Sequence, residues 1–239
     1  MIKSSKFAGL CGKLKVFQVD DGTDYTAIFR GFLEDSPEVS KTLLCERRTG
    51  PIWKISFRGR VFLIKHDLRK RHRFDYLAQS FFCGSNAERL IRGLEKMREN
   101  GFDGAYRIFL VADNRHFGCT FDSWIMMEFL EGVSLDVFLA RGESLTQFRV
   151  PVAKIVHALL RAGMVHGDIN PGNFMRLPDG RIKAIDISGK PVFPMTRAID
   201  RKWLRKFFGV PASAPGFDEK IYAIGRGVRK FFQRLRGAK

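Results

Sequence analysis

Ten residues in the second half of the chain, Val165 to Phe174, restrict its fold and chemistry more than any other segment. They read Val-His-Gly-Asp-Ile-Asn-Pro-Gly-Asn-Phe, and Ala-Ile-Asp-Ile-Ser-Gly follows at residues 184–189. The two motifs supply Asp168, Asn173 five residues later, and Asp186 beyond a short predicted hairpin. Phosphoryl transfer from ATP uses three such groups: one carboxylate orients and deprotonates the attacking hydroxyl, while an amide oxygen and a second carboxylate hold Mg²⁺. The two motifs in this order predict an ATP-dependent phosphotransferase.

Each of these side chains also has an alternative, structural interpretation. Asp168 could cap a helix or form an ion pair, and Asn173 and Asp186 belong to residue types that favour turns. All three together favour the chemical interpretation, with Asp168 as the catalytic base and Asn173 and Asp186 as ligands of Mg²⁺, which prefers hard oxygen atoms. His166 is expected to have a structural role, hydrogen-bonding and packing the loop, rather than to react.

The first half of the chain has the pattern of a sheet with one main helix. Residues 53–57 alternate between apolar and polar side chains, which predicts a strand with one buried face. A second, more apolar strand follows and ends at Lys65. Apolar side chains at helical spacing predict a helix over residues 87–97. Two further strands are expected, at residues 107–112 and 124–129.

The second half is predicted to be mainly helical. Apolar residues recur at helical spacing over residues 152–160, and the catalytic motif follows directly. Pro178-Asp179-Gly180 then predicts a tight turn between two short strands, because proline presets its φ angle and glycine permits a positive one. This hairpin would bring Asn173 and Asp186 together, as shared metal coordination requires.

This order of elements predicts an α+β protein with a protein-kinase-like, two-lobed fold. A small antiparallel-sheet N-lobe, with an N-terminal extension and one main helix, is expected over residues 1–130. A mainly helical, shortened C-lobe with the catalytic loop and a basic C-terminal helix is expected over residues 131–239. The boundary is expected near Glu131-Gly132.

In such a fold, Lys65 contacts the α- and β-phosphates of ATP and is held by a helix carboxylate. Glu88 is the candidate for that partner, although Ser85-Asn86-Ala87-Glu88 also fits a helix capping box. Glu95 is the second candidate. The segment that receives adenine through its backbone groups is expected at Met127, Glu128 and Phe129.

Three parts of a regulated protein kinase are missing from the sequence. The hairpin that would cover the phosphates contains only Gly50 and no Gly-x-Gly-x-x-Gly motif. The second carboxylate motif is Asp-Ile-Ser-Gly rather than Asp-Phe-Gly, and no Ala-Pro-Glu segment occurs after Asp186. These departures favour a small-molecule or glycan acceptor over a peptide.

The net charge of +17, from 42 Lys and Arg against 25 Asp and Glu, predicts an anionic partner. A nucleic acid, an anionic membrane surface and a polyanionic substrate all fit this charge. Residues 220–239 combine an apolar helical face with many basic side chains, which suits either an anionic membrane surface or packing on the C-lobe. The basic run at 69–73 could add to the same surface.

The sequence contains no apolar run that approaches a membrane span and no pattern of a secretory signal. The four cysteines lie far apart and form no zinc-binding spacing, which favours a reducing compartment. We therefore expect a cytoplasmic protein.

The sequence resembles the lipopolysaccharide core heptose kinases that phosphorylate the second heptose of the inner core. The resemblance covers nearly the whole chain, and its most specific parts are Lys190 directly after the Asp-Ile-Ser-Gly motif and the basic tail. It also includes the following segments: Tyr25, Phe32-Leu33, Glu88-Arg89-Leu90, Gly163-Met164-Val165, Gly167-Asp168, Gly172-Asn173-Phe174 and Asp200-Arg201.

The resemblance implies an ATP- and Mg²⁺-dependent sugar kinase that acts as a peripheral protein at the cytoplasmic face of the inner membrane. Its acceptor would be the anionic lipopolysaccharide core, which the positive charge of the chain suits. Arg197, Arg201 and Arg205 are candidates for contacting the anionic groups of that acceptor.

Other functions remain open at this point: a RIO-like or tRNA-modification kinase, an antibiotic kinase, or a pseudokinase scaffold without activity. The lack of interleaved aromatic residues suited to base stacking argues against nucleic acid as the partner.

Overall fold

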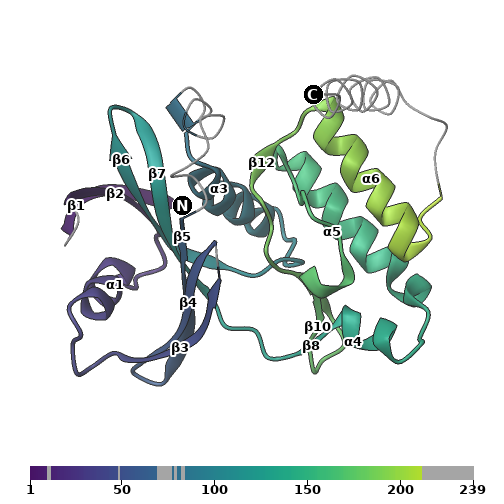
Figure 1. Ribbon diagram of the computed structural model, residues 1–239, viewed down its shortest axis with the longest axis horizontal. Helices are drawn as coiled ribbons and strands as arrows, with labels where there is room; N and C mark the ends of the chain where they lie inside the picture. The colour runs from purple at the N-terminus through teal and green to yellow at the C-terminus, as the bar shows by residue number, and fades with distance from the viewer. Residues whose placement is uncertain (10–11, 48, 69–76, 78–79, 82–83, 212–239) are drawn as a thin grey trace, which may run out of the picture. The chain divides into compact units, whose positions relative to one another are not determined.

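The computed structural model describes residues 1–9, 12–47, 49–68, 77, 80–81 and 84–211 of the chain (Figure 1). The basic run at 69–73 and the predicted C-terminal helix lie outside the described residues. The chain divides into two compact units, Met1–Glu131 and Gly132–Lys239.

The first unit is built on one large antiparallel sheet with the strand order β1-β2-β6-β7-β5-β4-β3. Its elements in chain order are β1 (Ile2–Gly9), β2 (Gly12–Val19), α1 (Tyr25–Leu33), β3 (Ser40–Arg47), β4 (Gly50–Phe57), β5 (Arg60–Asp67), α3 (Asn86–Glu99), β6 (Ile108–His116) and β7 (Cys119–Glu128). The sequence predicted α3 and the strands of this sheet from β4 onward. The sheet of seven strands is larger than the small sheet that was expected.

The N-terminal segment is an integral part of this sheet, whereas the sequence analysis assigned it no strand. β2 pairs with β6, with Phe17 opposite Val111, and β1 pairs with β2 along its whole length. The usual alternation is missing from β2, because Val16 and Phe17 are both fully buried. The predicted N-terminal extension of the N-lobe therefore forms two strands at one edge of the sheet.

Helices α1 and α3 cover opposite faces of β2. The guanidinium of Arg92 in α3 lies 5.3 Å from the ring centroid of Phe17. The next residue, Gln18, accepts hydrogen bonds from the backbone N–H and hydroxyl of Thr26 in α1, at 3.0 and 2.9 Å. Successive side chains of a strand point to opposite faces, so the sheet lies between the two helices.

Stacked aromatic rings form much of the core of this unit. The rings of Tyr25 and Phe109 stack at 4.9 Å, and those of Trp53 and Trp124 at 5.7 Å. The fully buried large side chains of the unit include Phe17, Phe29, Phe62, Ile55, Ile64, Ile91, Leu110 and Met126.

The described part of the second unit, residues 132–211, has three main helices and two small sheets. Its elements in chain order are β8 (Val133–Ser134), α4 (Leu135–Ala140), η2 (Leu145–Phe148), α5 (Arg149–Arg161), β9 (Met164–Val165), η3 (Pro171–Asn173), β10 (Phe174–Arg176), β11 (Ile182–Ala184), β12 (Lys190–Pro191) and α6 (Pro194–Phe208). The predicted helical stripe in α5 is confirmed, because Val152, Ile155, Val156 and Leu159 are buried.

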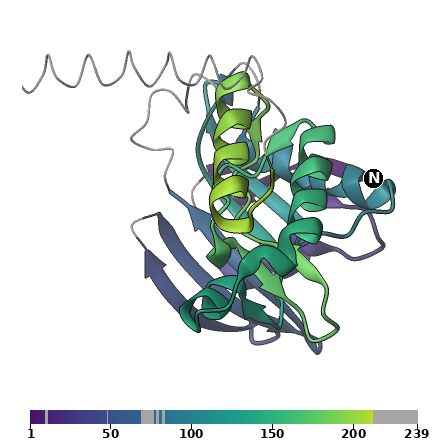
Figure 2. The same cartoon turned by 90° about the vertical axis from the view of Figure 1, so that its right-hand side faces the viewer.

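Helices α5 and α6 lie side by side in this unit, as both ribbon views show (Figures 1 and 2). In the same unit, β9 pairs with β12, and β10 pairs with both β8 and β11. The predicted turn at Pro178-Asp179-Gly180 joins β10 to β11. Among the described residues, no helix is long and apolar enough to span a membrane.

The fold is thus α+β, with a large antiparallel sheet and few helices.

Candidate active site

The loop that carries Asp168 is fixed at its start by a carboxylate from α6. Asp200 accepts hydrogen bonds from the backbone N–H groups of His166 and Gly167, at 2.9 and 3.0 Å. Its side chain is only 1% exposed, and burial raises its pKa to about 6 even though both N–H groups and the charge of Lys190 lower it. The sequence analysis gave Asp200 no role, because a carboxylate 32 residues after the loop carries no local signal of this contact.

His166 packs beneath the loop. Its imidazole is fully buried and tilts against the ring of Phe174, with the centroids 5.0 Å apart. Within the described part of the chain, neither ring nitrogen has a hydrogen-bond partner. Burial lowers the pKa of His166 to about 4, against the opposing charges of Asp168 and Asp186. The ring is therefore neutral at physiological pH and packs as expected, whereas the expected hydrogen bonds of its ring nitrogens are not found among the described residues.

The structure joins Asp168 directly to Asn173. The Asn173 amide nitrogen donates to the backbone oxygen of Asp168 at 2.9 Å and to its carboxylate at 3.1 Å. The Asp168 side chain is exposed. Because the amide nitrogen is used in this way, the amide oxygen is the atom of Asn173 that could ligate a cation.

Asp186 follows the hairpin that was predicted to return the chain to Asn173. Phe174 pairs with Ala184, and the N–H of Ile185 donates to the backbone oxygen of Asn173 at 2.8 Å. Asp186 is exposed and has a φ of 49°, a left-handed conformation that Asp tolerates better than most residues. The hairpin therefore sets the backbones of Asn173 and Asp186 next to each other.

An amide oxygen and a carboxylate are hard donors that suit Mg²⁺. The described residues contain no group of three or more His, Cys, Asp or Glu side chains that could hold a metal by themselves. A cation at Asn173 and Asp186 would therefore take further ligands from water or phosphate, as is usual for Mg²⁺ in phosphotransferases.

The Asp-Ile-Ser-Gly segment packs against the loop that carries Asp168. Lys190 pairs with Val165 in a short two-stranded sheet, and the N–H of Ser188 donates to the backbone oxygen of His166 at 2.9 Å. Gly167 has a φ of 82°, and a Cβ atom there would overlap the hydroxyl of Ser188. The loop needs glycine at this position both for its conformation and for this close approach.

In the first unit, Lys65 lies on β5, opposite Ile52 of β4 and Ile125 of β7. Its side chain is half-buried. The sequence predicted that this strand ends at Lys65. The strand instead continues to Asp67, so Lys65 lies within β5.

Glu88 lies in the first turn of α3. Ser85 caps this helix by accepting the N–H of Glu88 at 2.8 Å, which is one half of the predicted capping box. The Glu88 carboxylate lies 3.3 Å from Nε of Arg92 in the next turn. Its pairing with Lys65 stays a prediction.

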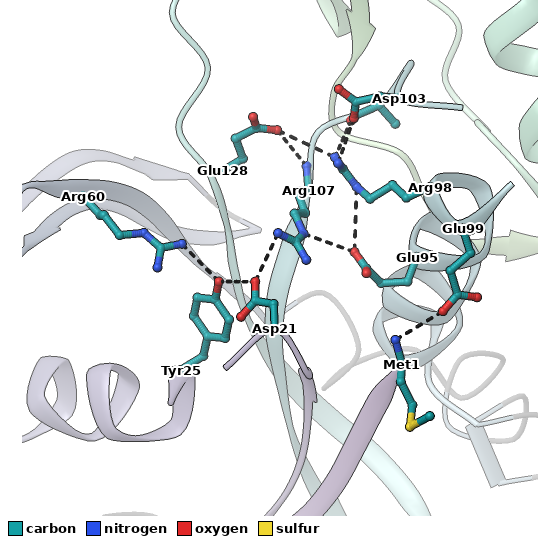
Figure 3. Close-up of polar contacts among 11 residues, drawn as sticks. Met1, Asp21, Tyr25, Arg60, Glu95, Arg98, Glu99, Asp103, Arg107 and Glu128 are labelled. Carbon is teal, nitrogen blue, oxygen red and sulfur yellow. Dashed lines mark hydrogen bonds and ion pairs between the residues drawn. The ribbon is translucent and has the colours of Figure 1, made fainter. Parts of the chain in front are cut away.

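The second candidate, Glu95, belongs to a network of charges around Arg107 (Figure 3). The Glu95 carboxylate is buried and lies 3.4 Å from Nε of Arg107 and 3.7 Å from Nε of Arg98. Arg107 also reaches Asp21 at 3.1 Å. Burial raises the pKa of Asp21, but hydrogen bonds from Tyr25 and Thr23 and the charge of Arg107 outweigh it and lower the pKa overall.

The same network fixes the predicted adenine-binding segment. The Glu128 carboxylate accepts the backbone N–H of Arg107 at 3.0 Å (Figure 3). In addition, the N–H of Glu128 donates to the backbone oxygen of Arg107 at 2.8 Å. Met127 pairs with Leu63 of β5. The N–H of Glu128 is thus used within the sheet, while Phe129 follows the end of β7 and lies 4.4 Å from the ammonium of Lys54.

Gly50 has a structural role in this sheet. It has a φ of 121°, and a Cβ atom there would overlap the backbone oxygen of His66 on the neighbouring strand. This close approach explains the glycine without any contact to phosphate.

Comparison with known proteins shows the family of the chain. The chain matches the model of the lipopolysaccharide core biosynthesis protein (WaaY) family over residues 1–238. It is similar to the lipopolysaccharide core heptose(II) kinase WaaY of Escherichia coli strain K12, with 23% identity over 239 residues, which cover 99% of this chain and 98% of the relative. A second Escherichia coli protein of the same description is 25% identical over 169 residues, which cover 70% of this chain and 71% of the relative.

Proposed function

Since the chain belongs to the lipopolysaccharide core biosynthesis protein (WaaY) family, we propose that it is an ATP-dependent kinase of a heptose hydroxyl in the lipopolysaccharide inner core. The hydrogen bond between Asp168 and Asn173 carries this proposal. It joins a solvent-accessible carboxylate to an amide within one loop, and the hairpin adds the second carboxylate, Asp186. These are the groups that phosphoryl transfer needs.

In the proposed reaction, Asp168 orients the sugar hydroxyl and takes its proton as the oxygen attacks the γ-phosphorus of ATP. The new oxygen–phosphorus bond forms as the bond between the γ-phosphorus and the β-phosphate oxygen breaks, which releases ADP. Asn173 and Asp186 would hold Mg²⁺, which neutralises charge on the phosphates when bound.

The nucleotide would bind as in a protein-kinase-like fold. This fold would have an N-lobe over residues 1–130 and a C-lobe over residues 131–239. Lys65, held by Glu88, would contact the α- and β-phosphates. The backbone of Met127, Glu128 and Phe129 would receive adenine. Since Gly50 serves the sheet, basic side chains rather than a glycine-rich loop would cover the phosphates.

The acceptor is an anionic, lipid-anchored sugar, and the charge of +17 favours attraction to it and to an anionic membrane surface. We infer that the protein acts as a peripheral protein at the cytoplasmic face of the inner membrane, with no nucleic acid as partner.

Replacement of Asp168 by Asn tests this function. We expect phosphate transfer to core lipopolysaccharide that lacks the heptose phosphate to fall by about 10²–10⁴. Binding of Mg-ATP, measured by thermal shift, should persist. The control is Asp179→Asn, which removes an exposed carboxylate that lies 2.6 Å from Nε of Arg181 at the β10–β11 turn.

Unchanged turnover in Asp168→Asn would remove this residue from the mechanism. If the wild-type chain showed no thermal shift with Mg-ATP and no transfer, a scaffold without kinase activity would be the better assignment.

A further inference from the structure

Helix α6 lies on the outer side of the described part of the second unit, with α5 on its inner side (Figures 1 and 2). Its buried side chains are Ala198, Asp200, Leu204 and Phe208. The ring of Phe208 packs edge-on against that of Phe174, with the centroids 5.6 Å apart. These contacts define the inner side of the helix, and the opposite side faces outward.

The outward side of α6 carries an apolar stripe. Met195, Ile199, Trp203 and Phe207 follow one another at intervals of four residues, which places them in successive turns of the helix. Met195 is 45% exposed, and the other three side chains are half-buried. The rings of Trp203 and Phe207 stack with their centroids 5.5 Å apart. The stripe therefore leaves part of two aromatic rings and of one thioether accessible.

Two exposed lysines accompany this stripe. The ammonium of Lys202 lies 5.3 Å from the ring centroid of Trp203. The ammonium of Lys206 lies 4.9 Å from the centroid of Trp203 and 5.0 Å from that of Phe207. Asp200 is the only acidic residue of α6, and it is buried on the inner side. The outward side thus combines aromatic rings with positive charge, and α6 adds no carboxylate to it.

The three arginines that were expected to contact the acceptor lie on a different side of the helix. Arg197, Arg201 and Arg205 line a cavity of about 270 Å³ between α5 and α6. The outward side of α6 is therefore a surface to which the sequence analysis gave no role.

An anionic lipid surface is the partner that this combination of side chains fits. Tryptophan is enriched at membrane–water interfaces, because its ring is amphipathic. Helices that lie in the interface combine Trp, Phe and other apolar side chains with Lys or Arg. Each lysine near an anionic leaflet adds electrostatic attraction, whereas a soluble anion would leave the apolar stripe in water.

We propose that the surface of an anionic phospholipid membrane binds the outward face of α6, which consists of Met195, Ile199, Lys202, Trp203, Lys206 and Phe207. The proposal rests on the peripheral membrane association inferred above and assigns that association to one helix. It does not depend on kinase activity. In the bound state the helix lies in the plane of the interface, with its aromatic rings among the headgroups and its lysines beside the lipid phosphates.

The inner side of the same helix gives this docking a functional consequence. Asp200 accepts the N–H groups of His166 and Gly167, so α6 holds the loop that carries Asp168. A helix fixed on the membrane surface would set the distance of that loop from the bilayer. A lipid-anchored acceptor lies at the same surface.

The first test removes the charge of the outward face from the full chain. Lys202→Gln/Lys206→Gln is compared with Lys154→Gln/Arg161→Gln, which removes the same charge from exposed side chains of α5. Flotation measures binding, without ATP, to vesicles of equal parts phosphatidylcholine and phosphatidylglycerol. We expect the first variant to bind about 10–30-fold more weakly. The control should change by less than about threefold, because salt screens charges that lie away from the docking surface.

The second test uses Trp203 as a reporter of lipid contact. The same vesicles are prepared with brominated acyl chains, which quench the fluorescence of a tryptophan that lies among the lipids. The other two tryptophans, Trp53 and Trp124, stack on each other in the first unit. We expect quenching in the wild type that disappears in Trp203→Phe. That variant should still bind the vesicles, since phenylalanine keeps an apolar ring at this position.

Equal weakening in both double variants would overturn the proposal, because it would show attraction by overall charge alone. Unchanged binding of Lys202→Gln/Lys206→Gln, or binding without quenching of Trp203, would overturn it as well, because another part of the chain would then contact the lipid. If the lysine variant unfolds at a lower temperature than its control, Lys202→Gln and Lys154→Gln provide the same comparison as single variants.

The soluble quencher acrylamide tests for other occupants of the face before vesicles are added. We expect Trp203 to be quenched. Protection of Trp203 in a monomer would assign the face to another segment of the chain, and protection in a dimer detected by light scattering would assign it to a second copy. Either result would overturn the proposal, as would a response of Trp203 to single-stranded DNA but not to vesicles. A protein that fails the Asp168→Asn test could still pass these tests, so the two failures are distinguishable.

Discussion

Asp200 offers the sharpest test of the forces that hold the loop that carries Asp168. Burial raises its pKa from 3.8 to about 6. At 1.36 kcal/mol for each pH unit, ionising it in the folded protein costs about 3 kcal/mol relative to the unfolded chain. The folded state therefore binds the proton more tightly. This contribution to stability is present below pH 3.8 and is lost as the pH rises through about 6.

The pH dependence of stability that His166 contributes has the opposite sign. Its pKa falls from 6.5 to about 4 in the folded protein, so acidification protonates the unfolded chain first. The resulting stability is present above pH 6.5 and is lost as the pH falls through about 4, again by about 3 kcal/mol. In the wild-type protein the two effects nearly cancel between pH 4 and pH 6.5.

Replacing Asp200 with Asn removes the pH dependence of stability that Asp200 contributes and leaves that of His166 in place. We expect the variant to gain about 3 kcal/mol relative to the wild type when the pH is raised from 4 to 7. A constant loss of about 1–2 kcal/mol should accompany this gain, because the amide group of Asn places a donor against one of the two N–H groups. Phosphate transfer should still fall, by up to about 100-fold, since the loop that positions Asp168 loses part of its support.

Urea unfolding followed by tryptophan fluorescence at pH 4 and pH 7 measures the effect, with Asp179→Asn as the exposed control. Asp179→Asn should show no comparable gain, because hydrogen bonds from Arg181 lower the pKa of Asp179. A difference between Asp200→Asn and wild type that is independent of pH would refute the reasoning. A change of the opposite sign would show that the two N–H donors outweigh burial.

Two further substitutions test the packing around the site. Gly167→Ala should destabilise the protein by about 1–3 kcal/mol, since it combines a φ of 82° with an overlap on the Ser188 hydroxyl; thermal unfolding measures this, and a neutral effect would contradict the close approach. Arg107→Gln should cost about 2 kcal/mol, because it removes the nearer of the two guanidinium groups beside the buried carboxylate of Glu95, at 3.4 Å, and leaves only Arg98 at 3.7 Å. Arg58→Gln, whose exposed ion pair spans 3.7 Å, should cost less than about 0.5 kcal/mol in the same assay; equal losses in these two variants would rule out the network as a determinant of stability.

Local sequence patterns predicted the helices and strands whose apolar residues recur at the usual spacing. The periodic apolar residues of α3 and α5 and the turn at Pro178-Asp179-Gly180 each depend on neighbours in sequence. The two N-terminal strands escaped prediction for a physical reason. Because α1 and α3 cover both faces of β2, its adjacent residues Val16 and Phe17 are both buried, and the alternation that marks a half-buried strand is lost.

The same distinction between local patterns and tertiary contacts applies to the candidate active site. The spacing of Asp168 and Asn173 predicted a pair of groups within one loop, and the hydrogen bond between their side chains agrees with that prediction. The ion pair of Glu95 with Arg107 could not be predicted, because Arg107 precedes a different element and reaches Glu95 only through tertiary packing.

The sequence by itself determined which chemical groups this protein carries and the order in which they occur: a carboxylate and an amide in one loop, and a second carboxylate after a short hairpin. The tertiary structure decided which distant groups act on them. Asp200 holds the loop only because α6 packs beside α5. Burial and charge depend on such packing, whereas spacing along the chain records only what lies within a few residues.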